Sequence, residues 1–292
     1  MLFANGTVAL ITGGSRGIGR AVALDLAAEG ATVVVNHSRS AEDAEQTAVA
    51  VRAKGGTAYV VAADVSDERA VRDMFVMLRQ EFGRLDVLVT SAGITADGFV
   101  AGMSLSDFEQ VMRVNMTGVF LCCREAARLM MRERKGAIVT LSSTTSDGSP
   151  GAANYAASKG AIVAFTRSVA AELAPYHVRA NVVSPGLVDT GMTRRMRAEV
   201  RAMLNEHILL ERAGKPEEVA RAVSFLASDN ASYITGACID VDGGLSLPVH
   251  LPPSRLLSGE RTRRRRISAS RSGTSAVSGR PDVRDGVDGH RI

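Results

Sequence analysis

Tyr155 and Lys159 stand four residues apart in the run Asn154-Tyr155-Ala156-Ala157-Ser158-Lys159. Residues with this spacing share one face of a helix. A lysine ammonium beside a tyrosine stabilises the phenolate, so we expect Lys159 to lower the pKa of Tyr155 below its ordinary value of about 10. The pair is then a candidate for proton transfer, with Tyr155 as general acid or base. The same spacing also arises by chance on amphipathic helices, so a catalytic role for the pair depends on motifs elsewhere in the chain.

Short apolar segments alternate with helical segments and predict how this pair is positioned. The expected strands are 7–12, 31–36, 57–62, 86–90, 137–142, 178–184 and 237–241. The expected helices are 17–29, 41–54, 68–82, 105–134, 153–173 and 191–227, the last with a break near Gly214-Lys215-Pro216. The strands lack polar alternation, which is typical of a parallel sheet covered on both faces. We predict a single α/β domain over residues 1–247, with a Rossmann-type, doubly wound, parallel seven-stranded sheet and helices on both faces.

The sequence changes character after residue 247. The whole chain carries a formal charge of +4, but residues 248–292 hold ten arginines against four carboxylates, which leaves about −2 for residues 1–247. This tail is rich in Arg, Ser, Gly and Pro, and it cannot bury enough apolar surface to offset its ordering entropy. We expect it to be disordered. The run Arg263 to Arg266 has no interleaved aromatic residues, so we expect no nucleic-acid partner.

Cysteine usage and the N-terminal sequence indicate the compartment. Cys122 and Cys123 are adjacent and rarely meet disulfide geometry, which favours a reducing environment. The first six residues have no basic region, and the apolar run Val8 to Ile11 is too short for a signal peptide or a membrane span. We expect a soluble, cytoplasmic protein without a membrane partner.

A glycine-rich loop between the first strand and the first helix is the candidate dinucleotide site. Its sequence, Thr12-Gly13-Gly14-Ser15-Arg16-Gly17-Ile18-Gly19, has the spacing G-x-x-x-G-x-G. Glycines allow the turn and let the backbone approach a pyrophosphate, whose charge the helix N-terminus favours. Such a turn can also merely join a strand to a helix, but its place in the fold favours binding. The expected contacts are Gly13, Ser15, Arg16, Gly17, Ile18 and Gly19.

The end of the second strand predicts which nicotinamide cofactor binds. An acidic residue there would accept hydrogen bonds from a ribose 2′-hydroxyl and repel a 2′-phosphate. This chain has Asn36-His37-Ser38-Arg39 instead, and Arg16 lies in the glycine loop. Two guanidinium groups and a hydroxyl favour a phosphate, so we predict NADP(H), with Asn36, Ser38 and Arg39 at the ribose. The alternative is that both arginines are solvated surface charges.

Two later loops add expected cofactor contacts. Asp64 and Val65 follow the third strand, where a carboxylate can meet the adenine amino group. Ser91, Ala92 and Gly93 follow the fourth strand, at the carboxyl edge where open α/β sheets bind ligands.

Several motifs in order resemble the short-chain dehydrogenase/reductase family over about residues 5–246. They are the glycine loop, Asn115 in Val114-Asn115-Met116-Thr117-Gly118, the pair Ser142-Ser143, Tyr155 with Lys159, Ser184-Pro185-Gly186, Thr190 and Asp242-Gly243-Gly244. The resemblance implies that Tyr155 donates a proton to a carbonyl oxygen as hydride arrives from the nicotinamide. It also implies that Ser143 holds the substrate oxygen, that Lys159 binds the nicotinamide ribose, and that Asn115 places a water in a proton relay. Pro185, Gly186, Val188 and Thr190 are expected at the cofactor, and no metal is expected.

The chain departs from the family pattern at two places. The family usually has Asn-Asn-Ala-Gly where this chain has Thr90-Ser91-Ala92-Gly93, so we expect the fold to persist and cofactor affinity to fall. The common spacing of the serine to Tyr155 points to Ser142, whereas counting along the fifth strand from Gly136 points to Ser143. We favour Ser143, because loops absorb deletions more readily than strands do.

Within the family, the chain is most similar to bacterial 3-oxoacyl-[acyl-carrier-protein] reductases. This rests on the segments 154–160, 225–229 and 232–236, and it implies reduction of a 3-oxoacyl thioester, with the acyl pocket under residues 94–103 and 187–210. The leading alternative is a reductase of a free sugar, steroid, quinone or small alcohol, and a non-catalytic NADP(H)-binding regulator is less favoured.

Two partners are also expected. Arg132, Arg134 and Lys135 form a basic edge for an acidic acyl carrier protein, although a solvated helix end explains them equally well. The resemblance further implies a homotetramer.

Overall fold

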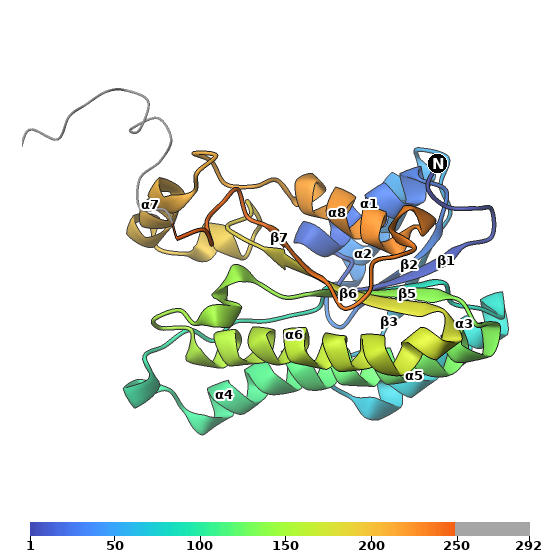
Figure 1. The fold of residues 1–292 in the computed structure, drawn as a ribbon, viewed down its shortest axis with the longest axis horizontal. Helices are drawn as coiled ribbons and strands as arrows, with labels where there is room; N and C mark the ends of the chain where they lie inside the picture. Colours follow the sequence, from blue (N-terminus) through green and yellow to red (C-terminus); the bar gives the residue numbers. More distant parts are fainter. Residues whose placement is uncertain (249–292) are drawn as a thin grey trace, which may run out of the picture. The chain divides into compact units, whose positions relative to one another are not determined.

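Seven strands form one parallel sheet in the computed structural model, which describes residues 1–248 (Figure 1). They are β1 (Val8–Thr12), β2 (Thr32–His37), β3 (Ala58–Ala62), β4 (Val87–Thr90), β5 (Gly136–Leu141), β6 (Val178–Pro185) and β7 (Cys238–Val241). The strand order is β3-β2-β1-β4-β5-β6-β7, and each neighbouring pair is parallel. The predicted doubly wound sheet is confirmed, and its order reverses between β1 and β4.

Helices cover both faces of this sheet. They are α1 (Gly17–Ala28), α2 (Ala41–Arg52), α3 (Glu68–Phe82), α4 (Leu105–Met112), α5 (Gly118–Glu133), α6 (Ala153–Leu173), α7 (Ala198–His207) and α8 (Pro216–Ala227). Figure 1 shows α1, α2 and α8 on one face and α3, α5 and α6 on the other. This arrangement follows from crossover connections that return each strand parallel to the previous one.

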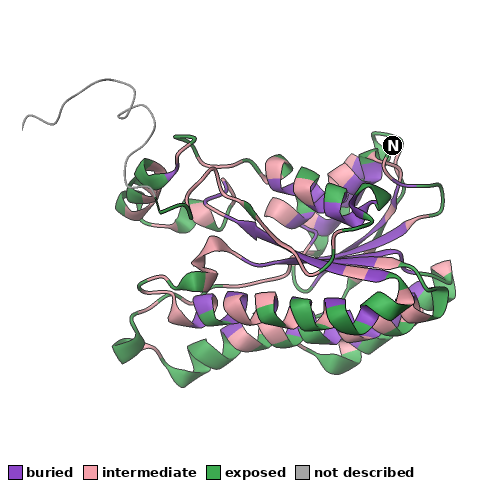
Figure 2. Cartoon of the chain, in the orientation of Figure 1, coloured by how far each residue is buried: buried purple, intermediate pink, exposed green. Residues whose placement is uncertain are grey.

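The five central strands are buried on both faces, as their continuous apolar sequence predicts, whereas the edge strands β3 and β7 are partly exposed (Figure 2). In β1, Ala9 and Ile11 join the core beneath α1 and α8, whereas Val8 and Leu10 join the core beneath α3 and α5. This alternation is the two-residue period of a strand. Two apolar cores therefore hold the sheet rigid between its helix layers.

Two predicted helical stretches are interrupted. The stretch 105–134 consists of α4, a π-helical turn over Arg113–Thr117, and α5. The stretch 191–227 contains a short 3₁₀ turn, α7 and α8, and Pro216 stands in the first turn of α8, where its missing N–H costs nothing. The π-helical turn contains Asn115 and belongs to the site described below.

Residues 1–248 belong to one compact unit. The disorder expected for the tail concerns residues that, apart from Pro248, lie outside the described range. Across residues 1–248, every helix is too short or too polar to cross a membrane.

Candidate active site

The glycine loop meets the segment after β4 at the point where the strand order reverses. A Cβ on Gly13 would lie 2.8 Å from the Cα of Ala92, and a Cβ on Gly19 would clash with the carbonyl oxygen of Gly13. Only glycine fits at either position. Helix α1 begins at Gly17 with no side-chain cap and no acidic residue in its first turn. Its N-terminal N–H groups are therefore free to receive an anion such as a pyrophosphate.

Asn36 supports this loop from behind. Its side chain is buried, Oδ1 accepts a hydrogen bond from Gly13 N at 3.4 Å, and Nδ2 donates to the carbonyl oxygen of Ala63 at 3.0 Å. Its backbone oxygen also accepts from Gly14 N at 3.0 Å. The polar atoms of Asn36 therefore hold the loop, and its contact with the ribose stays a prediction.

The other expected contacts on this side differ in exposure. Ser15 is buried and Ile18 half-buried, while Arg16, Ser38 and Arg39 are exposed beyond the ends of β1 and β2. Exposed guanidinium groups at this edge remain available to a phosphate.

Asp64 is exposed at the end of β3 and lies near Arg39. Partial burial raises its pKa, but hydrogen bonds from the backbone and hydroxyl of Ser66 and the charge of Arg39 hold the pKa below its ordinary value. Val65 is buried instead, and a Cβ on Gly118 would lie 2.8 Å from its Cγ2. Val65 therefore packs against the start of α5.

The segment after β4 lies between the glycine loop and Asn115. The backbone N–H groups of Ser91 and Ala92 donate to Thr12 Oγ1 at 3.1 and 3.3 Å. A Cβ on Gly93 would lie 3.4 Å from Asn115 Oδ1, so the absence of a side chain keeps this approach open. The departure Asn-to-Thr at position 90 leaves the sheet intact, since Thr90 remains in register with β1 and β5.

The segment after β6 closes the opposite side of the site. Pro185 ends β6, and a Cβ on Gly186 would lie 2.6 Å from Asp242 Cβ, so the backbones meet closely there. Val188 is buried, whereas the methyl of Thr190 lies 3.6 Å from the place of a Cβ on Gly17. Of the expected contacts beyond β6, Thr190 thus lies against the glycine loop.

Two reciprocal hydrogen bonds fasten α6 to the end of β5. The hydroxyl of Ser142 donates to the backbone oxygen of Lys159 at 2.9 Å, and Lys159 Nζ donates to the backbone oxygen of Leu141 at 2.7 Å. Ser142 and Lys159 are both buried. Burial lowers the pKa of Lys159 to about 8, so its amine is largely protonated at neutral pH.

Ser143, one residue further on, faces the phenol. Its Oγ accepts hydrogen bonds from the backbone N–H of Thr145 at 3.2 Å and from the Thr145 hydroxyl at 2.9 Å, and it also interacts with Tyr155. The geometry therefore favours Ser143 over Ser142 as the serine beside the reacting group, because Ser142 is committed to α6.

The expected lowering of the Tyr155 pKa is wrong for this structure. The side chain of Tyr155 is half-buried overall, and burial of its phenol group raises its pKa to about 12. A hydrogen bond with Ser143 lowers this pKa, and the charge of Asp97 raises it. Lys159 Nζ lies 5.5 Å from the centre of the Tyr155 ring and is directed at Leu141. The predicted helical spacing was correct. Desolvation of the phenolate raises the pKa of Tyr155 more than the ammonium of Lys159, at this distance, lowers it.

Asn115 links the segment after β4 to α6. Its Oδ1 accepts from Ile94 N at 2.8 Å, and its Nδ2 donates to Ile94 O at 3.0 Å and to Ser158 Oγ at 3.1 Å. Ser158 in turn donates to the backbone oxygen of Tyr155 at 2.7 Å. The side-chain amide thus connects the segment after β4 to the turn of α6 that carries Tyr155. Sequence reasoning missed Ser158, whose signal was its place one turn after the tyrosine.

Comparison with known proteins agrees with this arrangement. Residues 13–246 match a family model described as "Enoyl-(Acyl carrier protein) reductase". A crystal structure of a short-chain type dehydrogenase/reductase from Mycobacterium marinum superposes with a TM-score of 0.81 at 37% identity, over 84% of this chain and 97% of that one. This protein belongs to the short-chain dehydrogenase/reductase family. It is therefore an oxidoreductase that acts on a ketone or alcohol and binds a nicotinamide cofactor.

Two relatives from this family have named activities. A 3-oxoacyl-[acyl-carrier-protein] reductase from Synechocystis sp. is 44% identical over 240 residues, which cover 82% of this chain and 96% of the relative. A 3-oxoacyl-[acyl-carrier-protein] reductase, FabG, from Staphylococcus aureus is 42% identical over 238 residues, covering 81% and 97%.

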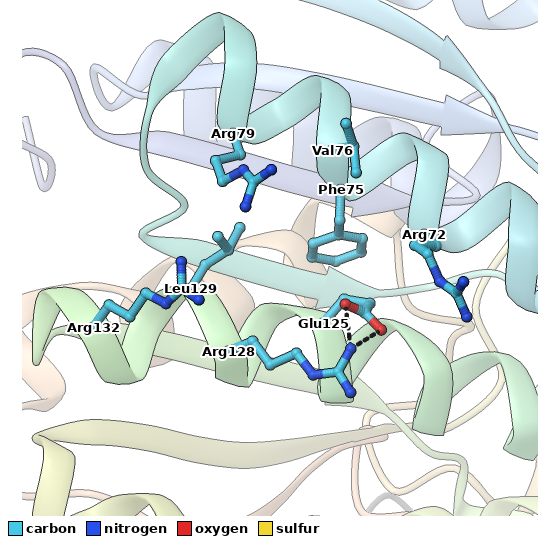
Figure 3. Close-up of a pocket in the computed structure, with 8 residues that line it drawn as sticks. All are labelled: Arg72, Phe75, Val76, Arg79, Glu125, Arg128, Leu129 and Arg132. Atoms are coloured by element: carbon cyan, nitrogen blue, oxygen red, sulfur yellow. Dashed lines mark hydrogen bonds and ion pairs between the residues drawn. The ribbon is translucent and has the colours of Figure 1, made fainter.

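A separate groove of about 190 Å³ lies between α3 and α5 (Figure 3). Arg72 and Arg79 line it from α3, and Arg128 and Arg132 line it from α5, where Arg128 pairs with Glu125 at 2.8 Å. None of the expected catalytic or cofactor residues lines this groove.

The two serines should separate stability from activity. Ser142→Ala removes a buried hydrogen bond and should lower the free energy of unfolding by roughly 1–3 kcal/mol, while much of the activity remains. Ser143→Ala should unfold at nearly the wild-type urea concentration and lose roughly a hundredfold in kcat. Urea unfolding and initial rates of both variants check this. An active Ser143→Ala beside a stable, inactive Ser142→Ala would reverse the assignment.

Proposed function

We propose that this protein reduces a 3-oxoacyl thioester on acyl carrier protein to the 3-hydroxyacyl form, with NADPH as the hydride source. The observation that carries the proposal is the placement of Tyr155 beside Ser143, with Lys159 fixed one helical turn further on. The names of the Synechocystis and Staphylococcus relatives support the substrate class.

Tyr155 acts as the proton donor in this mechanism. Its raised pKa keeps the phenol protonated, which suits the reducing direction. The phenol and the Ser143 hydroxyl both donate to the substrate carbonyl oxygen and stabilise the negative charge that develops there. When bound, NADPH supplies the hydride. Lys159 lies where its ammonium can donate to a ribose hydroxyl, and Asn115 holds the segment that carries the site.

The loop after β1 fits the dinucleotide. A Cβ on Gly13 or Gly19 would clash with neighbouring backbone, and the uncapped N-terminus of α1 begins within the loop. Arg16, Ser38 and Arg39 are exposed where a 2′-phosphate would lie, and the end of β2 carries no carboxylate. These features support NADPH over NADH.

The carrier protein would approach the basic edge at the end of α5. Arg134 donates to the backbone oxygen of Pro175 at 3.0 Å, and Lys135 lies 3.6 Å from Asp229, so both cations also hold local structure. Arg132 remains exposed at the end of the groove in Figure 3. Its charge suits an acidic partner.

A homo-oligomer, a tetramer by family resemblance, is part of the same proposal. Phe120 on α5 is 40% exposed and packs edge-on against Phe165 of α6, with ring centres 6.3 Å apart. Tyr233 is fully exposed. Large apolar side chains at the surface are typical of subunit interfaces.

A substrate panel tests the reaction. Purified protein should oxidise NADPH with an acetoacetyl thioester faster than with free ketones, sugars, steroids or quinones. Tyr155→Phe should lower kcat by about 10²–10⁴-fold with little change in NADPH affinity, because only the proton donor is removed. Tyr176→Phe is the matched control and should retain activity. Preferred turnover of a free ketone, or of a crotonyl thioester, would contradict the proposed substrate.

Cofactor preference tests the phosphate site. We expect kcat/KM to be higher with NADPH than with NADH, and Arg39→Ala to reduce this preference roughly 10- to 100-fold, the usual worth of a charge-assisted hydrogen bond. Arg79→Ala, on the far end of α3, is the matched control. Equal or better kcat/KM with NADH in the wild type would refute the NADPH assignment.

A further inference from the structure

Residues 94–98, here called the strap, follow β4 and lie against the N-terminal turn of α6. Asn115 holds the backbone of Ile94 through two hydrogen bonds, at 2.8 and 3.0 Å. Asn154 Nδ2 donates to the carbonyl oxygen of Ala96 at 2.8 Å. The backbones of Ile94 and Ala96 are therefore both held by hydrogen bonds, Ile94 by Asn115 and Ala96 by Asn154 of α6.

The last tie is at Gly98. Its backbone N–H donates to the carbonyl oxygen of Gly151 at 2.8 Å, and it forms a parallel bridge with Ala152, just before α6. Asp97 thus lies between two anchored residues, Ala96 and Gly98. Its place beside the start of α6 is set by backbone and amide hydrogen bonds, not by its own side chain.

Asp97 is a carboxylate without a structural task. Within residues 1–248 it makes no ion pair, and its side chain makes no hydrogen bond with protein. The residue is exposed, although partial burial of the carboxyl group raises its pKa. Polar side chains with fixed positions and no internal partner are available to act on a ligand.

Asp97 stands beside the first turn of α6, which carries Tyr155, because its neighbours Ala96 and Gly98 contact Asn154 and Ala152. Burial is the largest cause of the raised pKa of Tyr155. Among residues 1–248, the negative charge of Asp97 raises this pKa further. The nearby cation, Lys159, is turned toward the backbone oxygen of Leu141. A carbonyl that receives the tyrosine proton therefore brings its substituents toward the side of the site that carries the Asp97 charge.

We propose that Asp97 is a specificity residue that makes the site select uncharged ketones, such as 3-oxo thioesters and esters, over ketones that carry a carboxylate near the carbonyl. The proposal rests on the proposed function and names the selectivity of the same site. A free 3-oxo acid places its carboxylate two carbons from the ketone, and like charges at such separations repel strongly in a partly desolvated site. Linking the acid as a thioester removes that charge.

The ester and the free acid of one ketone test this selectivity. Full-length protein with NADPH should show a higher kcat/KM for ethyl 3-oxobutanoate than for 3-oxobutanoate. Asp97→Asn should reduce this ratio roughly tenfold, mainly by improving use of the acid, because it removes the like charge at nearly constant shape. Asp97→Glu should keep the preference. Glu109→Gln, an exposed acid on α4, is the matched control and should leave the ratio unchanged.

Asp97→Ser, which is also neutral, repeats the test if the asparagine variant fails to fold. The role of Asp97 would be overturned if both neutral variants still reduced the ester and neither changed the ester-to-acid ratio of kcat/KM by more than about twofold. The proposed function would then still stand. A wild type that reduces neither the ester nor an acetoacetyl thioester would overturn both.

Discussion

The site depends on the reciprocal pair of hydrogen bonds between β5 and α6. Ser142 reaches the backbone of Lys159, and the Lys159 amine reaches back to the carbonyl oxygen of Leu141. Both side chains are buried, so breaking either contact would leave a polar group without a partner. The pair fixes the start of α6 over the sheet edge, and Tyr155 stands one turn before it. Lys159 therefore holds α6 to β5 and is also a candidate ligand of the ribose.

Two further contacts bring the rest of the chain to the same edge. Gly13 approaches the backbone of Ala92 so closely that a side chain is excluded, which joins the glycine loop to the segment after β4. Asn115 then ties that segment to α6 through Ile94 and Ser158. The cofactor loop and the phenol are therefore held by one continuous set of short contacts, and the π-helical turn is where α4 and α5 adjust to let Asn115 reach them.

The sequence predicted the architecture well because strand and helix periods are local properties. The continuous apolar strands and the Tyr155–Lys159 spacing both reappear in the structure. The π-helical turn was missed, since local periodicity does not reveal the contact that its Asn115 makes with Ile94, 21 positions away. The loop-holding role of Asn36 was missed for a similar reason: only the fold shows that its side-chain amide contacts Gly13 and Ala63. The Tyr155 pKa was predicted in the wrong direction because spacing carries no information on burial.

The central claim is that the fold itself keeps Tyr155 protonated and so ready to donate a proton. The chain has only four tyrosines, so ¹³C labelling of the tyrosine ring carbon that bears oxygen gives a simple NMR spectrum. The signal missing from Tyr155→Phe identifies the residue. In the cofactor-free protein, this signal should titrate with a pKa of about 12. A pKa below the ordinary value of about 10 would contradict the account, because it would show that Lys159, not burial, sets the charge state of the phenol.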